Sequence, residues 1–474
     1  MVTMPESDNA HRAPSCRVVV VGGGIGGLAA ARHLDRRLRR RADVEVTLIN
    51  RDNFFLLSPL LFEACSGVLE LRHCAQPIRP CLKRARFVEG TVKCVDVDRR
   101  VVNVLLADGA DHELPYDHAV IALGAATNLS LIPGSEHART FKTVADGLLL
   151  RNHLIEQLEA AYVETDPQRR RELLTVVVVG GGLVGVELLG ELTAFLRDEL
   201  QYYPGLKRDD LDFHLFEAGA RLIPESMAFL ADYAAKILRG RGAQLHVSTP
   251  VNAIEAGAVR WSGGVVKAQT IVLASGIVPN AVAAAMAVER DRRGRIVTDA
   301  TLRSVSHPSV WAIGDCAATP APEGGIYPAL AQNAVRAARV VARNVVAVLE
   351  QRAPAPFVYQ SLGTMAAFGH TRAACDVRGL ELSGWVAWWV RRTYYLLQMP
   401  RWDTRLRIAL DWTVSLLSRP DLTKIDLAPE REQERRNHAA GASLEGMDVV
   451  RLRMLDESGP VVEDLTPATH DAAR

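Results

Sequence analysis

Short runs of consecutive apolar residues, each closed by glycine or a polar residue, recur along this chain. The first occupies residues 17–21, and a helix-like pattern over residues 27–41 and a second apolar run over residues 44–49 follow it. Short apolar runs that flank a helix-length segment are typical of a βαβ unit, whose parallel strands are buried on both faces. The start of the chain therefore predicts an α/β fold.

The same pattern returns later in the chain, which predicts a second βαβ unit. Its strands are expected at residues 175–179 and 213–216, with a helix at 184–200 between them. Other expected strands lie at residues 87–98 and 100–106, as a hairpin or meander, and at 116–123, 270–273 and 310–313. A helix is expected at 329–348, and the Ala-Pro-Ala-Pro sequence at 353–356 indicates a boundary after it.

Both predicted units carry a glycine loop between the first strand and the helix, 158 residues apart. The G-x-G-x-x-G spacing is formed by Gly22, Gly24 and Gly27 in the first loop and by Gly180, Gly182 and Gly185 in the second. In this motif the first glycine permits a tight turn, the second lets a pyrophosphate approach the backbone, and the third lets the helix pack close to the strand. The N–H groups at the start of the helix favour phosphate. Two loops predict two bound dinucleotides and electron transfer between them.

The residue at the end of the second strand of each unit differs between the two loops. This position normally carries an acid that binds a ribose hydroxyl. The first unit has Asn50 there, and the second has Glu217. Asparagine can still hydrogen-bond a ribose, whereas the carboxylate of Glu217 repels the 2′-phosphate of NADP and favours NADH.

Three strand ends carry further candidate residues. The strand at 310–313 ends in Gly314-Asp315, and Gly124 and Gly276 close two other strands, in Ala122-Leu123-Gly124 and Ala274-Ser275-Gly276. Together with the two loops, these strings resemble the two-dinucleotide-binding flavoprotein superfamily, which holds FAD and NAD(P)H. The resemblance implies that Asp315 binds the ribityl chain of FAD. Leu123 departs from the superfamily's A-T-G junction, which has threonine there.

The seven cysteines argue against a dithiol relay. Disulfide reductases of this superfamily carry C-x4-C after the first unit, but here Cys65 is followed by Glu70 at the partner position. We expect all seven thiols to be buried and inert. No metal site is predicted, because the chain contains no C-x-x-C pair.

The chain is more specifically similar to type II NADH dehydrogenases, the single-subunit NADH:quinone oxidoreductases, from about residue 17 to residue 427. The matching strings include N-F-F-L-L-S-P-L-L at 53–61, G-V-E-L-L-G-E-L at 185–192 and L-S-G-W at 382–385. The resemblance implies that Glu187 lies near the nicotinamide and flavin rings. The family's quinone motif A-Q-x-x-x-Q is matched by Ala331 and Gln332, but Arg336 replaces its second glutamine. An arginine there could donate to a quinone carbonyl, or pair with a carboxylate and block the quinone.

Five of the seven tryptophans lie between Trp385 and Trp412, among tyrosines and arginines that include Arg391 and Arg392. Tryptophan and tyrosine favour the membrane interface, and arginines can extend towards lipid head groups. This segment reads as an amphipathic membrane anchor, with Trp385, Trp388, Trp389 and Leu396 on one helical face. A dimer or core interface is the alternative, and the family uses the region for both purposes, which implies a homodimer.

Charge and hydropathy limit the kinds of partner and the cellular location that we expect. The net charge of +1 gives no field that would point to nucleic acid. No apolar stretch approaches the roughly 18–20 residues needed to span a bilayer, and the N-terminus lacks the apolar core of a signal peptide. We therefore expect a peripheral protein on the cytoplasmic face of the cell membrane.

The expected fold is α/β, with two doubly wound three-layer domains in which the NADH domain is inserted into the FAD domain. An FAD-binding domain is expected at 17–145 and 291–352, an NADH-binding domain at 146–290, a membrane or dimerisation region at 353–427, and tails at 1–16 and 428–474. The predicted reaction passes a hydride from NADH to FAD and two electrons to a membrane quinone, without proton pumping. Glu187 would position the rings and Gln332 would line the acceptor pocket. The alternatives are a soluble diaphorase-type reductase with another acceptor, and a redox-sensing protein with little turnover.

Overall fold

The computed structural model describes residues 14–417 and 422–424, and the described residues up to Leu422 belong to one compact unit. The tails predicted for residues 1–16 and 428–474 lie almost wholly outside the described residues. Strand β1 (Cys16–Val21) begins at the last residue of the predicted N-terminal tail.

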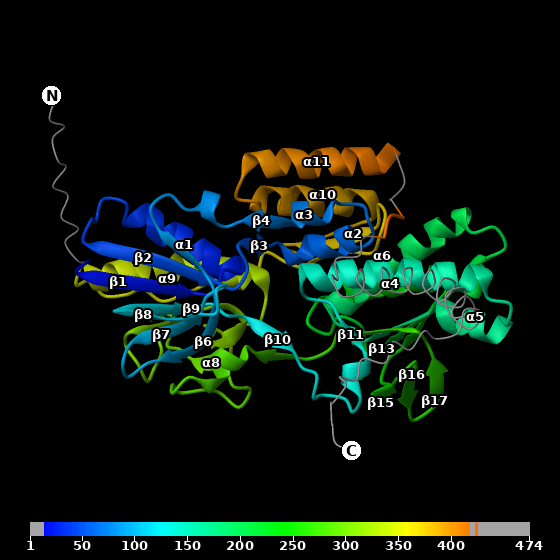
Figure 1. The fold of residues 1–474 in the computed structure, drawn as a ribbon, viewed down its shortest axis with the longest axis horizontal. Helices are drawn as coiled ribbons and strands as arrows, with labels where there is room; N and C mark the ends of the chain where they lie inside the picture. Colours follow the sequence, from blue (N-terminus) through cyan, green and yellow to red (C-terminus); the bar gives the residue numbers. More distant parts are fainter. Residues whose placement is uncertain (1–13, 418–421, 425–474) are drawn as a thin grey trace, which may run out of the picture. The chain divides into compact units, whose positions relative to one another are not determined.

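A five-stranded parallel sheet forms the first part of this unit (Figure 1). Its strand order is β21 (Val310–Ala312), β9 (His118–Ile121), β1, β2 (Val44–Asn50) and β5 (Arg86–Glu89). Val18, Val20 and Val21 in β1 are fully buried, as expected for a parallel strand covered on both faces.

Different layers cover the two faces of this sheet. Helices α1 (Ile25–Arg37) and α9 (Ala331–Leu349) pack against each other and against the face that carries Val18 and Val20. The face that carries Val19 and Val21 packs on an antiparallel sheet of β6 (Thr91–Asp96), β7 (Val101–Leu105) and β8 (Asp111–Pro115). The doubly wound prediction therefore needs correction, because strands take the place of helices on one face.

The predicted strand at residues 87–98 is also divided. Its first part belongs to β5 of the parallel sheet, and its second part is β6 of the antiparallel sheet. The chain passes between the two sheets at Gly90, where an added Cβ would lie 2.5 Å from the side chain of Val104. The sequence concealed this break because apolar residues occur on both sides of Gly90, with Phe87 and Val88 buried in β5 and Val95 buried in β6.

A second parallel sheet repeats the arrangement. Its strand order is β11 (Arg139–Thr140), β18 (Thr270–Leu273), β12 (Thr175–Val179), β13 (Asp212–Phe216) and β14 (Ala243–His246). Helices α4 (Val144–Val163), α6 (Leu183–Glu199) and α7 (Ala228–Gly240) contribute buried side chains to one face. The other face packs on the antiparallel strands β15 (Val251–Glu255), β16 (Ala258–Trp261) and β17 (Gly264–Lys267).

The second sheet is inserted into the first, as the sequence predicted. The chain leaves the first sheet after β9 and returns to it at β21, and the second sheet is built from the residues between them. The two crossing segments, β10 (Ala125–Thr127) and β19 (Ile277–Pro279), pair antiparallel. Strand β11 joins the second sheet before residue 146, so the chain crosses earlier than the expected boundary.

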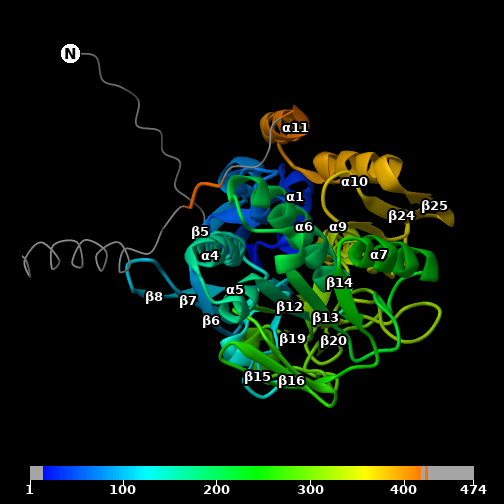
Figure 2. The ribbon, with the colours of Figure 1, turned by 90° about the vertical axis from the view of Figure 1, so that its right-hand side faces the viewer.

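The C-terminal part adds a small sheet and two helices. Strands β23 (Met365–Ala367), β24 (Ala373–Val377) and β25 (Leu380–Ser383) form the sheet on which α10 (Gly384–Gln398) packs. Helix α11 (Trp402–Leu417) contacts α10 and the short helix α3 (Leu71–Cys74), and both C-terminal helices lie on the same side of the unit (Figures 1 and 2). Within the described residues, no helix combines the length and apolar content of a membrane-spanning segment.

Candidate functional site: two glycine loops and a buried ion cluster

The two glycine loops have the same backbone geometry. Gly22 has a φ of +102° and Gly180 a φ of +117°, which side-chain-bearing residues rarely adopt. A Cβ on Gly27 would lie 1.7 Å from the carbonyl oxygen of Gly22, and one on Gly185 would lie 1.9 Å from that of Gly180. Each helix therefore starts directly against the end of its strand, as a dinucleotide loop requires.

The N-cap residue of each helix is a glycine, which has no side chain to cap the first N–H groups. Gly24 is the N-cap of α1 and Gly182 that of α6, and neither helix has a capping side chain at this position. A Cβ added to Gly24 would meet no atom within 4 Å. This open space beside the first N–H groups of α1 fits the pyrophosphate of a dinucleotide.

The strand-end residues Asn50 and Glu217 make the same contact. Asn50 Oδ1 accepts a hydrogen bond of 2.8 Å from the Gly23 N–H, and Glu217 Oε2 accepts one of 2.7 Å from the Gly181 N–H. Asn50 also donates through Nδ2 to the carbonyl oxygen of Asp52, at 2.8 Å. The amide thus holds the first loop in the way that the carboxylate holds the second.

A carboxylate already lies at the phosphate position of the second loop. Glu225 Oε1 accepts a hydrogen bond of 3.3 Å from the N–H of Leu183, the first residue of α6. An acidic oxygen at a helix N-terminus stands in for a phosphate oxygen. The contact shows that the start of α6 can hold an anionic oxygen.

Asp315 lies at the carboxyl end of the first sheet, directly after β21. Burial raises the pKa of its carboxyl group, and Lys142 opposes this shift. Gly314, beside it, follows the end of β21, while Gly124 and Gly276 follow β9 and β18. A half-buried acid at the carboxyl end of a parallel sheet fits the hydroxyl groups of a ribityl chain.

Glu187 belongs to a buried ion cluster. It lies on α6 and is 4% exposed, and its Oε1 lies 2.8 Å from Arg391 Nη2 of α10. The same oxygen accepts a hydrogen bond of 2.9 Å from the N–H of Ala367 in β23. Burial raises the pKa of Glu187, and Arg391 lowers it.

Glu63, on α2 (Leu61–Cys65), holds the other side of this cluster. Its two carboxylate oxygens lie 3.2 Å from Arg391 Nη1 and 3.0 Å from Arg392 Nη2. The indole N–H of Trp412, on α11, donates to Glu63 Oε2 at 2.7 Å. One carboxylate therefore joins α10 and α11 to the core.

Glu191 lies one helical turn after Glu187 and is also buried. Ser66 Oγ donates a hydrogen bond of 3.2 Å to its Oε2. Burial and the nearby Glu63 carboxylate raise the pKa of Glu191 to about 7. It is the member of the cluster whose charge changes near neutral pH.

The predicted acceptor residues lie at the start of α9. Gln332 donates to Ser361 Oγ at 2.9 Å and to the Gly363 carbonyl at 3.2 Å, and it accepts a hydrogen bond of 2.8 Å from the Tyr359 hydroxyl. Arg336 is exposed, and its guanidinium lies 5.7 Å from the centre of the Tyr359 ring. Ala331 is exposed at the first position of the helix.

Tyrosines of α10 lie between this group and Glu187. Burial raises the pKa of Tyr394, with a further contribution from Tyr359 and an opposing one from Arg336. The rings of Tyr394 and Tyr395 are 5.3 Å apart, and Arg391 lies 4.9 Å from the centre of the Tyr395 ring. The structure thus connects Gln332 and Glu187 through side chains of α10.

The structure corrects several expectations for side chains. Arg391 and Arg392 do not extend to the surface, because they are 1% and 6% exposed and pair with acids. Trp388 is buried, unlike Trp385 and Trp389 on the same helix.

The seven cysteines are all free, but they are not all buried as expected. Cys94 is exposed, and Cys16 and Cys81 are half-buried. Burial raises the pKa of Cys65 to about 12. A thiol with such a pKa stays protonated at neutral pH, which fits the absence of a dithiol role for this residue.

Sequence reasoning missed Glu63, Glu191, Glu225 and Tyr359. A signal existed for Glu191, because it follows Glu187 by four residues in the otherwise apolar string 186–192 and so lies on the same face. Glu63 lies in the short apolar string 60–65. An acid inside such a string indicates a buried partner.

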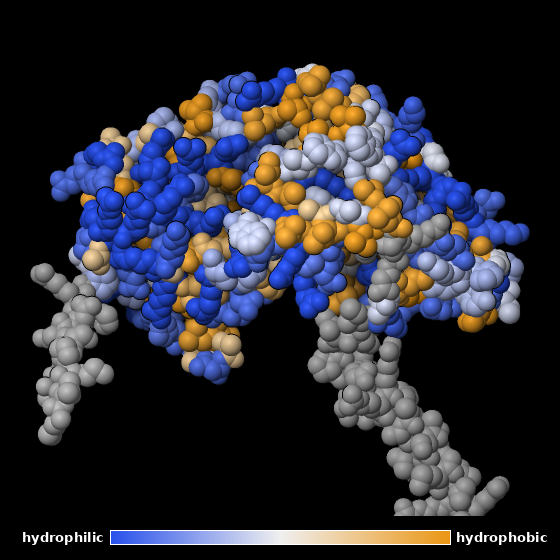
Figure 3. Space-filling view, turned by 90° about the horizontal axis from the view of Figure 1, so that it is seen from above, coloured by the Kyte–Doolittle hydropathy of each residue, from blue (hydrophilic) through white to orange (hydrophobic). Residues whose placement is uncertain are grey.

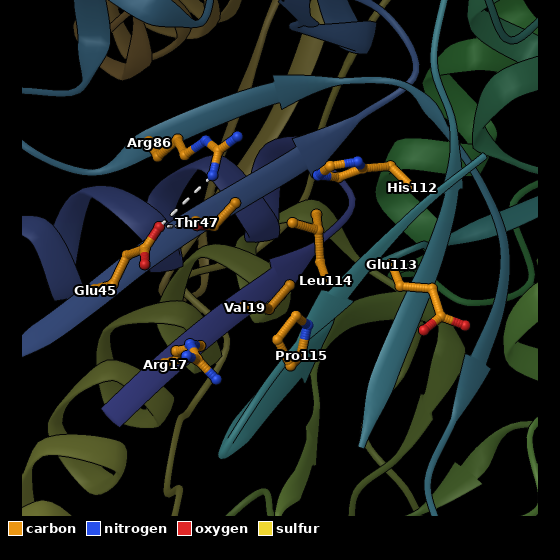
Figure 4. A pocket seen from close by; sticks show the side chains of 9 residues that line it. All are labelled: Arg17, Val19, Glu45, Thr47, Arg86, His112, Glu113, Leu114 and Pro115. Atoms are coloured by element: carbon orange, nitrogen blue, oxygen red, sulfur yellow. Dashed lines mark hydrogen bonds and ion pairs between the residues drawn. The ribbon is translucent and has the colours of Figure 1, made fainter. Parts of the chain in front are cut away.

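A cavity of about 230 Å³ lies elsewhere, between the first parallel sheet and β8 (Figure 4). The parallel strands line it with Arg17, Val19, Glu45, Thr47 and Arg86, and β8 lines it with residues 112–115. None of the predicted site residues lines this cavity. Within the described part of the chain, no group of three or more His, Cys, Asp or Glu side chains could hold a metal ion.

Comparison with known proteins places this geometry among flavoenzymes. The family of pyridine nucleotide-disulphide oxidoreductases matches residues 16–338. The type II NADH:quinone oxidoreductase Ndh of Mycobacterium tuberculosis is 31% identical over 423 residues, which cover 85% of this chain and 88% of that protein. The demethylphylloquinone reductase NdbB of Synechocystis is 28% identical and covers 85% of this chain and 96% of its own length. The fold matches the structure of NDH2 from Plasmodium falciparum in complex with NADH, with a TM-score of 0.78, 19% identity, and coverage of 86% of this chain and all of that one.

Replacing Glu225 by glutamine is expected to strengthen NADH binding. The substitution removes a negative charge that competes with the pyrophosphate at the start of α6. Charges at a helix terminus contribute about 0.3–1 kcal/mol, so the KM for NADH should fall about two- to fivefold. Steady-state kinetics measure this change, and kcat and flavin content should stay constant. Asp209→Asn removes the same charge from an exposed residue of the short 3-10 helix η5 (Arg208–Asp210) and should leave the KM unchanged. Equal KM values for both variants would contradict the role of Glu225.

Replacing Glu191 by glutamine should change how stability depends on pH. The folded chain keeps the Glu191 proton up to a pKa of about 7, whereas the unfolded chain loses it near the ordinary glutamate pKa of 4.5. The stability of the wild-type protein therefore falls as pH rises through this window. Glu191→Gln lacks this loss and should be more stable at pH 8 by about 2–3 kcal/mol, with little difference at pH 4.5. Denaturant titration at both pH values measures this, with the exposed Glu323→Gln as control. A difference between wild type and Glu191→Gln that does not vary with pH would rule out the titration.

Proposed function

The chain belongs to the pyridine nucleotide-disulphide oxidoreductase family and, within it, to the type II NADH:quinone oxidoreductases, and we propose that its two loop sites pass electrons from NADH through FAD to a quinone. Bound FAD supplies the redox chemistry, since it accepts a hydride and passes on two electrons. The net reaction consumes NADH, one proton and a quinone, and it yields NAD⁺ and a quinol. The proposed reaction pumps no protons.

The observation that carries this proposal is the pair of loops on two sheets of one chain. We assign FAD to the first loop with Asn50 and Asp315, and NADH to the second loop with Glu217. The NADH-binding sheet is inserted between β9 and β21, and β10 and β19 form the crossing. A carboxylate at residue 217 favours NADH over NADPH by repelling a 2′-phosphate.

Glu187 is proposed to position the reacting rings. It extends from α6, whose first turn belongs to the NADH loop, and Arg391 and the Ala367 N–H fix its carboxylate. A carboxylate held by two partners keeps a defined geometry without covalent chemistry. The side chains of this chain therefore orient the reactants and hold charge near them.

Gln332 and Arg336 are proposed to contact the quinone. Three hydrogen bonds fix the Gln332 amide, and one of them comes from Tyr359, against whose ring Arg336 lies. Arg336 forms no ion pair with a carboxylate in residues 14–417 and 422–424, so its donors are available to a carbonyl oxygen. This favours the donor role over the blocking role that the sequence left open.

We propose that α10 and α11 bind the membrane surface from which the quinone comes. Their exposed apolar side chains include Trp385, Trp389, Trp402 and Leu417, at 56–88% exposure. Figure 3, which views the unit from the side of these helices, shows hydrophobic side chains gathered over them. Such a face suits insertion at the level of the lipid head groups. Recovery of the flavoprotein in the soluble fraction of a vesicle flotation experiment would contradict this part.

We also propose a homodimer on the cytoplasmic face of the cell membrane. The exposed apolar side chains of α10 and α11 lie together and are not scattered singly over the surface, and a second copy of the chain could cover part of this group. Sedimentation velocity of the detergent-solubilised flavoprotein tests the dimer, which a monomeric mass would exclude.

NADH oxidation with a panel of quinones and soluble acceptors tests the proposed reaction. NADH should bleach the flavin in stopped flow, and quinones should restore it faster than dyes or protein acceptors. Bleaching without preference for quinones would favour a diaphorase-type reductase. If bound FAD were confirmed and no bleaching followed, the chain would be a binding protein and not an enzyme.

Arg336→Gln should slow the quinone half-reaction and leave flavin reduction by NADH unchanged. The variant removes a charged donor whose hydrogen bond to a carbonyl is worth about 1.5–3 kcal/mol, so the rate should fall at least about tenfold. Stopped flow resolves the two half-reactions. Arg378→Gln, an exposed arginine in the turn between β24 and β25, serves as control. An unchanged quinone half-reaction would remove Arg336 from the acceptor site.

A further inference from the structure

Two neighbouring helices present exposed arginines that no acid neutralises. They are Arg32, Arg36 and Arg37 on α1 and Arg336, Arg339 and Arg343 on α9. We call these six residues the arginine row. Within the described residues, none of them forms an ion pair with a carboxylate. Because the whole chain has a net charge of only +1, this local excess is compensated elsewhere.

The packing of α1 on α9 brings the two sets of arginines together. Ala31 and Leu34 of α1 and Ala338 and Val341 of α9 are fully buried in the same core cluster. Small side chains on the inner faces let the helices approach closely, so their outer faces form one surface. On α9 the arginines follow Gln332 at spacings of four, three and four residues, which keeps them on one stripe.

His33, a residue of α1, is affected by the arginines of both helices. Burial lowers the pKa of His33 to about 4, together with Arg36, Arg37, Arg339 and Arg32 from both helices. His33 is therefore neutral at pH 7 and adds no charge.

The acids that lie nearest to α1 in the sequence are already engaged. Asp35 is buried and accepts backbone hydrogen bonds from Lys83, Arg84 and Ala85. Asp43 pairs with Arg41 at 2.7 Å. Neither carboxylate is available to the arginine row.

The arginine row borders the apolar face of α10 and α11. Arg336 is close enough to Tyr394 of α10 for its charge to oppose the rise in pKa that burial causes in that tyrosine. Burial also raises the pKa of the Cys81 thiol, and Arg32 and Arg401, the residue before α11, are both close enough to oppose this rise. Figure 3 shows a dense hydrophilic region over the α1 and α9 side, next to the hydrophobic region over the C-terminal helices. An apolar face and a basic border thus lie on one side of the unit.

We propose that the arginine row binds the phosphate groups of anionic lipids, so that the protein prefers anionic membranes and turns Gln332 towards the bilayer. This inference rests on the proposed membrane association of α10 and α11. Anionic lipids attract basic residues near the surface, and guanidinium groups suit phosphate oxygens. A nucleic acid would match the charge but not the apolar face beside it, so a lipid surface fits both observations.

Vesicle binding of the full-length flavoprotein tests the proposal with a matched pair of variants. R36Q/R339Q/R343Q removes three charges from the arginine row and spares Arg336. R290Q/R292Q/R293Q removes three exposed arginines from the loop after α8 (Ala281–Ala285), which lies on the side opposite α10 and α11 in Figure 1. Vesicles of phosphatidylcholine alone are compared with vesicles in which about a third of the lipid is phosphatidylglycerol. NADH oxidation with a soluble quinone should be equal for all three proteins and so confirms that the variants fold.

The wild-type protein should bind the anionic vesicles more tightly, and salt should weaken this preference. Each arginine that is removed is expected to lower the affinity for anionic vesicles about fivefold, so the row variant should bind them roughly a hundredfold more weakly than wild type. The row variant should bind phosphatidylcholine vesicles as tightly as wild type. The control variant should match wild type on both kinds of vesicle.

Equal wild-type binding to both vesicles, or equal loss in both variants, would overturn the proposal. Two further results would overturn it if the row variant bound vesicles as tightly as wild type. One is that the wild-type protein binds DNA and the row variant does not, and the other is that the row variant sediments differently from wild type. Failure to bind either vesicle would overturn both this inference and the proposed membrane association. Binding without an anionic preference would overturn the inference alone.

Discussion

The buried ion cluster around Glu63 and Arg391 is the constraint on which the site depends. An ionised group buried without a partner costs several kcal/mol, and here acids from α2 and α6 are matched by arginines from α10. The Trp412 N–H adds the outermost helix to the same carboxylate. The C-terminal helices are therefore held to the core by buried ion pairs whose separation would cost much free energy. The orientation of Glu187 depends on α10, the helix that also carries exposed apolar side chains.

The two glycine loops show how one backbone device serves two nucleotides. Asn50 and Glu217 accept equivalent N–H hydrogen bonds, so a negative charge is not required to hold the loop. At residue 217 the charge has a second, proposed effect, since a carboxylate there would repel a 2′-phosphate. Glu225 lies at the second loop, and no carboxylate contacts the N-cap region of the first among the described residues. These differences agree with a permanently bound cofactor in one site and an exchanging one in the other.

Local patterns could be read from the sequence, and distant partnerships could not. The glycine loops and the strands and helices directly around them follow from spacing and apolar runs within short windows. The inserted second sheet was expected only from the family resemblance, and the division of residues 384–417 into two helices was not foreseen. Arg391 was misread because its partner Glu63 lies 328 residues away, and nothing in the composition of residues 383–417 separates an arginine that faces lipid from one that faces a buried acid. The antiparallel layers were missed for a similar reason, since a strand pattern does not state which sheet it joins. Tyr359 acquires its place beside Gln332 through the fold alone.

The shared use of α10 has a practical consequence for protein engineering. A truncation before residue 384 would remove the apolar face and would be the obvious route to a water-soluble form. It would also strip Glu63 and Glu187 of their guanidinium partners and open the core at Trp412. Solubility is better sought by polar replacement of the outward side chains alone, because the exposed tryptophans of α10 and Arg391, which holds Glu63 and Glu187, lie on opposite faces of that helix.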